Sequence, residues 1–118
     1  MVELNNKMNY HNKKFRAVHN SENGEISAQT IFRYKQEGSI LTSEYSGGQV
    51  TKGHLIGLVD SSGEIEIRYH QINMRGELMT GICQSKPEVL QNGKIRLHET
   101  WAWTCGDYSK GTTILEEL

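Results

Sequence analysis

The most chemically suggestive residue in this chain is Glu99, a carboxylate on a predicted strand face that is otherwise apolar. The residues that share its face are Ile95, Leu97, Trp101 and Trp103. A carboxylate on an interior face loses hydration, which raises its pKa unless a cation or hydrogen-bond donors compensate. Glu99 is therefore predicted to be the polar anchor of a binding site. The alternative is that it sits near an open end of the fold or pairs with an arginine.

Tyrosines and a glutamine fall on the matching faces of other predicted strands. Apolar walls with a few polar anchors are the usual composition of a small-molecule site. Together with Glu99, the predicted ligand-binding residues are Tyr34, Tyr45, Tyr69, Gln71 and Trp101. Trp101 and Trp103 are expected to form either a stacking wall for the ligand or part of a plain core. This pattern predicts a non-enzymatic protein that binds a small polar-aromatic or amphipathic molecule.

Other combinations of reactive residues are incomplete. Three histidines, His54, His70 and His98, fall on separate predicted strands, and neither His-x-His nor His-Glu-x-x-His spacing occurs. No metal site and no cofactor are therefore predicted. Gly-x-Ser-x-Gly and glycine-rich phosphate loops are also missing from the sequence. An enzyme remains open as the alternative, with Glu99 and either Tyr69 or His54 as acid and base.

A ladder of glycine-bearing turns must position these residues. The seven turns are expected at Asn23-Gly24, Glu37-Gly38, Gly47-Gly48, Ser62-Gly63, Arg75-Gly76, Asn92-Gly93 and Lys110-Gly111. Steps of roughly 10 to 17 residues leave room for one strand each and exclude crossover helices. Several of these pairs favour the positive φ that two-residue hairpin loops require. The ladder predicts an antiparallel up-and-down meander of about eight strands.

The expected strands cover residues 15–19, 27–36, 39–46, 49–60, 64–73, 77–84, 94–105 and 112–118. Pro87 follows the sixth, and we expect a bulged strand that continues through Leu90, or else a helical turn that begins at Ser85. Closing the sheet would remove its two edges, and eight strands close round a small interior. The predicted fold is thus all-β, a lipocalin-like (calycin) barrel, with an open or sandwiched sheet as the alternative.

The composition of the 118-residue chain fits a single domain with a partly polar interior. Hydrophobic residues make up 36% and aromatic residues 8%, which is low for a tightly packed globule. With 13 basic and 14 acidic residues, there is no overall field to attract nucleic acid or an anionic membrane. No apolar stretch approaches the roughly 20 residues that span a bilayer. The predicted partner is a small molecule of unknown identity, and self-association into a homo-oligomer is left open.

The N-terminal part is polar and aperiodic, so residues 1–14 are expected to be a disordered extension and residues 15–118 the barrel domain. Met8 is an alternative start to Met1. The N-terminus lacks the apolar segment of a signal peptide. Without a secretory signal, Cys83 and Cys105 are expected to be free thiols in a reducing cytoplasm.

Three stretches carry a resemblance to a known group of proteins. They are Ser43-Glu44-Tyr45-Ser46-Gly47-Gly48, Gly53-His54-Leu55-Ile56-Gly57 and Arg96-Leu97-His98-Glu99-Thr100-Trp101-Ala102-Trp103-Thr104. Over about residues 9–118 the chain resembles short uncharacterised bacterial all-β proteins that often carry the label N-acetylglutamate synthase. The resemblance implies acetyl transfer from acetyl-CoA to glutamate as the alternative function, and it implies no catalytic residues. No Gln or Arg in this chain is followed three positions later by Gly, the spacing found in the acetyl-CoA loop of common acetyltransferases.

Overall fold

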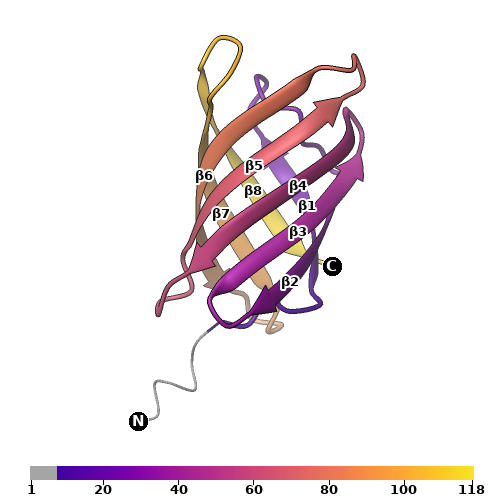
Figure 1. Cartoon of the computed structure of the whole chain (residues 1–118). Coiled ribbons are helices and arrows are strands. Elements are labelled where there is room, and N and C mark those ends of the chain that lie inside the picture. Colours follow the sequence, from indigo (N-terminus) through magenta and orange to yellow (C-terminus); the bar gives the residue numbers. More distant parts are fainter. Residues whose placement is uncertain (1–7) are drawn as a thin grey trace.

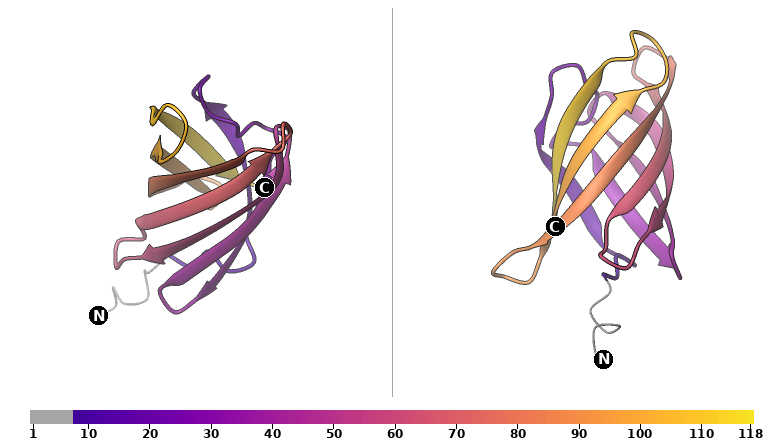
Figure 2. Two further views of the ribbon diagram at one scale, coloured as in Figure 1. Left: turned by 45° about the horizontal axis from the view of Figure 1, so that its top comes forward. Right: turned by 90° about the vertical axis from the view of Figure 1, so that its left-hand side faces the viewer.

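The computed structural model describes residues 8–118, which form a closed barrel of eight antiparallel strands (Figure 1). The strands are β1 (Lys14–Asn20), β2 (Ile31–Glu37), β3 (Ile40–Gly47), β4 (Val50–Val59), β5 (Ile65–Asn73), β6 (Leu78–Val89), β7 (Ile95–Trp103) and β8 (Lys110–Glu117). Each strand pairs with the next, and β8 closes on β1 from Phe15↔Glu117 to Asn20↔Thr113. The strands run obliquely across the wall, as the further views show (Figure 2). The predicted all-β, calycin-type barrel is confirmed.

Five hairpins turn on glycines in the left-handed region, at predicted sites: Gly38, Gly48, Gly63, Gly76 and Gly93. The prediction was wrong for Lys110-Gly111, since both residues lie within β8. The connection from β7 to β8 instead contains Gly106, with φ 59°. Gly111 instead faces Trp101 across the sheet, where a Cβ would meet the indole ring.

Pro87 does not cause the predicted bulge. Strand β6 pairs with β7 without a register shift from Gly81↔Trp103 to Val89↔Ile95, with Pro87 opposite Leu97. On the other side, the pairing of β6 with β5 extends only to Ser85, which faces Ile65 at the start of β5. Pro87 therefore lies beyond the part of β6 that β5 covers, where the missing N–H leaves no gap in a ladder.

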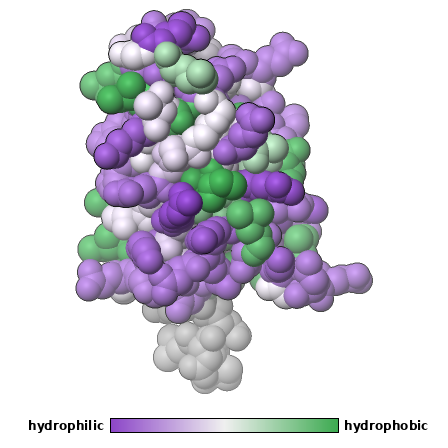
Figure 3. Space-filling model, turned by 90° about the vertical axis from the view of Figure 1, so that its right-hand side faces the viewer, coloured by the Kyte–Doolittle hydropathy of each residue, from purple (hydrophilic) through white to green (hydrophobic). Residues whose placement is uncertain are grey.

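Alternation along each strand separates the interior from the outer wall. Strand β4 turns Leu55 and Val59 inward and Ile56 and Leu58 outward. Hydrophilic side chains cover most of the outer face seen in Figure 3, with hydrophobic ones scattered among them. None of residues 8–118 forms a helix that could cross a membrane.

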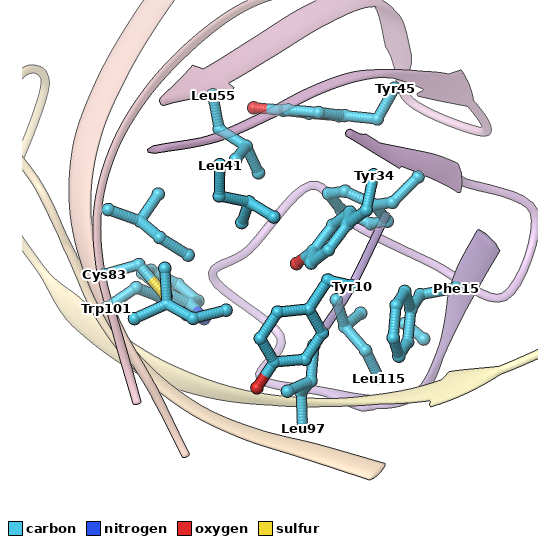
Figure 4. Packing of buried hydrophobic residues seen from close by; sticks show 14 of the residues in the cluster. Tyr10, Phe15, Tyr34, Leu41, Tyr45, Leu55, Cys83, Leu97, Trp101 and Leu115 are labelled. Atoms are coloured by element: carbon cyan, nitrogen blue, oxygen red, sulfur yellow. The ribbon is translucent and has the colours of Figure 1, made fainter. Parts of the chain in front are cut away.

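One end of the barrel is filled by aromatic packing that begins before the predicted domain boundary. Tyr10 is fully buried, and its ring packs against Phe15 and Tyr34 (Figure 4). Its hydroxyl donates a 2.6 Å hydrogen bond to the carbonyl of Gly63. The expected extension over residues 1–14 was therefore too long, since Tyr10 closes this end and Lys14 begins β1. Residues 1–7 and the choice between Met1 and Met8 as the start lie outside the described residues.

The interior changes character along the barrel axis. Aliphatic side chains such as Leu41, Ile65, Leu97 and Leu115 fill the half next to Tyr10. Buried polar residues also point inward, mostly toward the other half: Glu25, Thr30, Ser43, Gln71, Asn73, Ser85 and Thr113. Both cysteines are free thiols, as the sequence predicted. The polar half of the interior is therefore the candidate for a ligand-binding site.

Candidate ligand-binding site

A pocket opens at the end of the barrel opposite Tyr10, where β1 and β2 are joined by residues 21–30. All eight strands contribute to its wall, with Tyr45, Leu55, Tyr69 and Trp101 among the lining residues. The cavity is small, with a volume of about 40 Å³. That is room for about three waters, so the pocket is nearly filled by its own side chains.

Three aromatic rings lie flat on the wall because a glycine stands opposite each on the next strand. The cross-strand pairs are Tyr45↔Gly53, Tyr69↔Gly81 and Trp101↔Gly111. A Cβ at each glycine would come within 2.3, 2.1 and 2.3 Å of the facing aromatic side chain, respectively. Glycine in a strand interior often marks such a close approach. These glycines let the rings spread along the wall instead of projecting across the barrel.

The indoles of Trp101 and Trp103 line one side of the pocket and are hydrogen-bonded toward the β1–β2 connection. Trp101 and Trp103 meet edge to face with centroids 5.5 Å apart, and Trp103 meets Tyr69 in the same way at 5.9 Å. The Trp101 indole N–H donates to Thr113 Oγ1 at 2.8 Å, and the Thr113 hydroxyl donates to Asn20. The Trp103 indole N–H donates to the carbonyl of Asn23 at 3.0 Å.

A second series of hydrogen bonds runs along the β5 side of the pocket. The Tyr45 hydroxyl donates to Gln71 Oε1 at 2.8 Å, and Gln71 Nε2 donates to Glu25 Oε1 at 2.9 Å. Asn73 Nδ2 donates to the other carboxylate oxygen of Glu25 at 2.8 Å, and Arg75 approaches that oxygen at 3.6 Å. Glu25 belongs to the loop after β1, yet only 7% of its surface is exposed. Its carboxylate therefore closes the mouth of the pocket.

Glu99 points into the barrel next to this pocket. It stands between Ser85 and Thr113 in the register. Burial raises the pKa of Tyr34, Tyr45 and Cys83, and the nearby charge of Glu99 adds to the rise. Burial raises the pKa of Glu99 itself to about 7, against a smaller lowering by Ser85 and Cys83. Within residues 8–118, the buried Ser85 and Tyr34 hydroxyls lack a partner that meets hydrogen-bond geometry. The residue as a whole keeps some accessible surface, since it also lines a shallow groove on the outer wall beside His98.

The predicted site residues divide into two groups. Tyr45, Tyr69, Gln71 and Trp101 line the pocket. Tyr34 and Glu99 do not: Tyr34 packs against Tyr10 and Phe15 at the filled end, and Glu99 lies beside the pocket, opposite Ser85 and Thr113. The suggested pairing of Glu99 with His54 was wrong, since His54 lies on the outer face of β4 beside the ring of His70. A ligand-binding role for all six residues stays a prediction.

Sequence reasoning missed the loop residue Glu25 and the strand-end residue Asn73. Asn73 continues the inward alternation of Tyr69 and Gln71, so its place on the pocket side was available from the pattern. Nothing in the local sequence marks Glu25, because a loop side chain has no periodicity. Arg75 was assigned only to a turn.

The arrangement is suited to holding a molecule rather than to attacking one. Burial raises the pKa of Cys83 and Tyr69, so both groups stay protonated and weakly nucleophilic near neutral pH. Among residues 8–118, no group of three or more His, Cys, Asp and Glu side chains lies close enough to hold a metal ion.

The closed eight-stranded barrel with an aromatic pocket at one end agrees with the comparison to known families. A family model described as "Avidin-like protein" matches residues 8–118. The chain belongs to this avidin-like family. The resemblance to proteins labelled N-acetylglutamate synthase was therefore wrong as a guide to family, because the match over the whole barrel is to an avidin-like protein. No curated protein matches the chain.

Membership of the avidin-like family places the chain among small-ligand-binding β-barrels. The pocket end described above is the part of this avidin-like barrel with the composition of such a site.

Proposed function

We propose that this avidin-like protein binds a small ring-containing organic molecule of the biotin type in the pocket between Trp101, Trp103, Tyr45 and Tyr69. The observation that carries the proposal is the aromatic wall laid flat over cross-strand glycines. Such a wall offers π-faces and apolar area, while Gln71, Thr113 and Asn20 supply donors and acceptors for the polar edge of a ligand. The binding is non-enzymatic, and residues 21–30 must move to admit the ligand.

Binding is tested with biotin and with the neutral ring dye 1-aminoanthracene, followed by tryptophan emission and by the melting temperature. We expect a saturable change in emission and a rise in melting temperature, because a ligand that binds only the folded state stabilises it. Trp103→Leu removes the ring that touches both Trp101 and Tyr69, and a weakening of about tenfold or more is expected.

The matched control is Tyr108→Leu, which removes an exposed aromatic side chain in the neighbouring loop. It should leave the affinity unchanged. The proposal is wrong if neither compound alters emission or melting temperature at millimolar concentration, or if both variants change the affinity equally.

Self-association belongs to the same proposal. Outward-facing Ile40, Ile56 and Leu58 form an apolar groove on β3 and β4, beside Arg68 of β5. Burying such a groove against a second copy would remove apolar surface from water. Sedimentation velocity measures self-association of the wild type and of Leu58→Lys, which should associate more weakly. A wild type that is monomeric at all concentrations would exclude this part of the proposal.

A further inference from the structure

The pocket is closed by its own chain, and the closing group is a carboxylate. Residues 21–30, here called the lid segment, cross the mouth and place Glu25 against β5. Three donors converge on that carboxylate: the amides of Gln71 and Asn73, one to each oxygen, and the guanidinium of Arg75. They stand 46 or more residues away along the chain. Asn73 and Arg75 also donate to Glu77 Oε1, at 2.9 and 3.0 Å, so Glu77 holds both donors in place beside Glu25. This geometry forms a receptor for an acid group.

The receptor is oriented without help from Glu25. Gln71 Oε1 accepts from the Tyr45 hydroxyl, so the amide nitrogen of Gln71 must face the mouth. Asn73 Oδ1 accepts from the backbone N–H groups of Arg75 and Glu77 at 3.0 and 2.9 Å, which turns its nitrogen toward the same point. Gln71 and Asn73 are each only 2% exposed. Donors fixed in this way lose little freedom when an acid group binds.

The lid segment is attached mainly by polar contacts near the surface. Asn23 donates to Ser109 Oγ at 2.9 Å and to the carbonyl of Lys110 at 2.8 Å, and Asn20 donates to the carbonyl of Ile26 at 2.7 Å. Within residues 21–30, Ile26 is the one partly buried apolar side chain that packs against the core. Segments with few buried apolar contacts open at low free-energy cost.

We propose that Glu25 is a built-in occupant of the acid receptor formed by Gln71, Asn73 and Arg75, and that the carboxylate of a small molecule takes its place when the lid segment moves aside. The inference rests on the proposed function in one respect, that the displacing molecule uses the same pocket. It adds the chemical class of the ligand and the way in which the free protein keeps its pocket closed. Exchange of one carboxylate for another leaves the charge at the buried amides unchanged, so no unpaired donor is created.

The receptor is tested with sodium acetate against acetamide, a pair that differs in charge but not in size, at ionic strength matched with sodium chloride. The variant is Glu25→Ala, and the readout is the side-chain amide signals of Gln71 and Asn73 and the indole N–H signals in ¹H–¹⁵N spectra. Acetate should shift the amide signals saturably and acetamide should not. In the wild type the same shifts should need at least about tenfold more acetate, because the tethered carboxylate competes.

Glu22→Ala is the matched control, since Glu22 is an exposed acid three residues away on the same loop. Glu22→Ala should need the same acetate concentration as the wild type to shift the amide signals. Glu25→Gln keeps the shape of the lid, and it should bind acetate more tightly than the wild type even if Glu25→Ala folds poorly. The inference is overturned if acetate and acetamide shift the amides alike, or if acetate binds neither Glu25 variant more tightly than the wild type.

These outcomes are separate from those of the proposed function. Acetate binding without any response to biotin or the dye would uphold the receptor and reject the ring-containing ligand. Dye binding without an acetate response would uphold the ring-binding pocket and reject the acid receptor.

Discussion

Glu99→Gln isolates the effect of one buried carboxyl group on the stability of the barrel. Burial raises the pKa of Glu99 from 4.5 to about 7, since the charged form loses hydration inside the barrel. In the unfolded chain the group releases its proton near pH 4.5, whereas in the folded chain it keeps the proton to about pH 7. Between these values the folded state binds more protons, so the free energy of unfolding falls as the pH rises.

The size of the effect follows from the shift. At about 1.36 kcal/mol for each pKa unit, the wild type should lose at most about 3 kcal/mol between pH 4.5 and pH 8 through this group. Most of the loss should occur below pH 7, and the contribution of Glu99 should level off by pH 8. Glutamine has nearly the same shape and does not titrate, so Glu99→Gln should lack this part of the pH dependence.

The assay is urea unfolding followed by tryptophan emission at several pH values from 4.5 to 8. The decisive quantity is the difference in unfolding free energy between the wild type and Glu99→Gln, in which all other titrating groups cancel. Glu44→Gln, on the exposed outer face of β3, is the control and should not alter the slope. Parallel curves for the wild type and Glu99→Gln would refute the reasoning. A wild type that gains stability relative to Glu99→Gln as the pH rises would show instead that a cation pairs with the carboxylate.

Two further substitutions test the wall and the closed end. Gly81→Ala should lower the free energy of unfolding by about 1–3 kcal/mol, because its Cβ would lie 2.1 Å from the Tyr69 hydroxyl; in a Tyr69→Ala background the same change should cost almost nothing, and equal costs in both backgrounds would contradict the close-approach explanation. Tyr10→Phe should cost about 1 kcal/mol in urea unfolding, because it leaves the Gly63 carbonyl without its buried donor; Tyr108→Phe, on the surface, is its control, and no difference between the two would argue against the buried hydrogen bond.

Much of the fold was predictable because its signals are local. Alternation through Ile65, Ile67, Tyr69 and Gln71 depends only on the two-residue period of a strand, and the structure turns all four toward the interior or its lining. Glycine turns are local in the same sense, since positive φ is a property of one residue. For the same reason the inward direction of Glu99 could be inferred from Leu97 and Trp101, its neighbours along the strand.

What the sequence alone determined is therefore which residues turn inward and where most hairpins end. Only the tertiary structure decided how far along the axis each inward residue lies, because that depends on the register of every strand pair and on closure between β1 and β8. This is why Tyr34 and Glu99 fall outside a pocket that includes Tyr45 and Gln71. The register also places Gly111 under Trp101, a contact between strands that no local pattern can reveal. The carboxylate of Glu25 is the extreme case, since a loop side chain reaches its partners only after the whole barrel has closed beneath it.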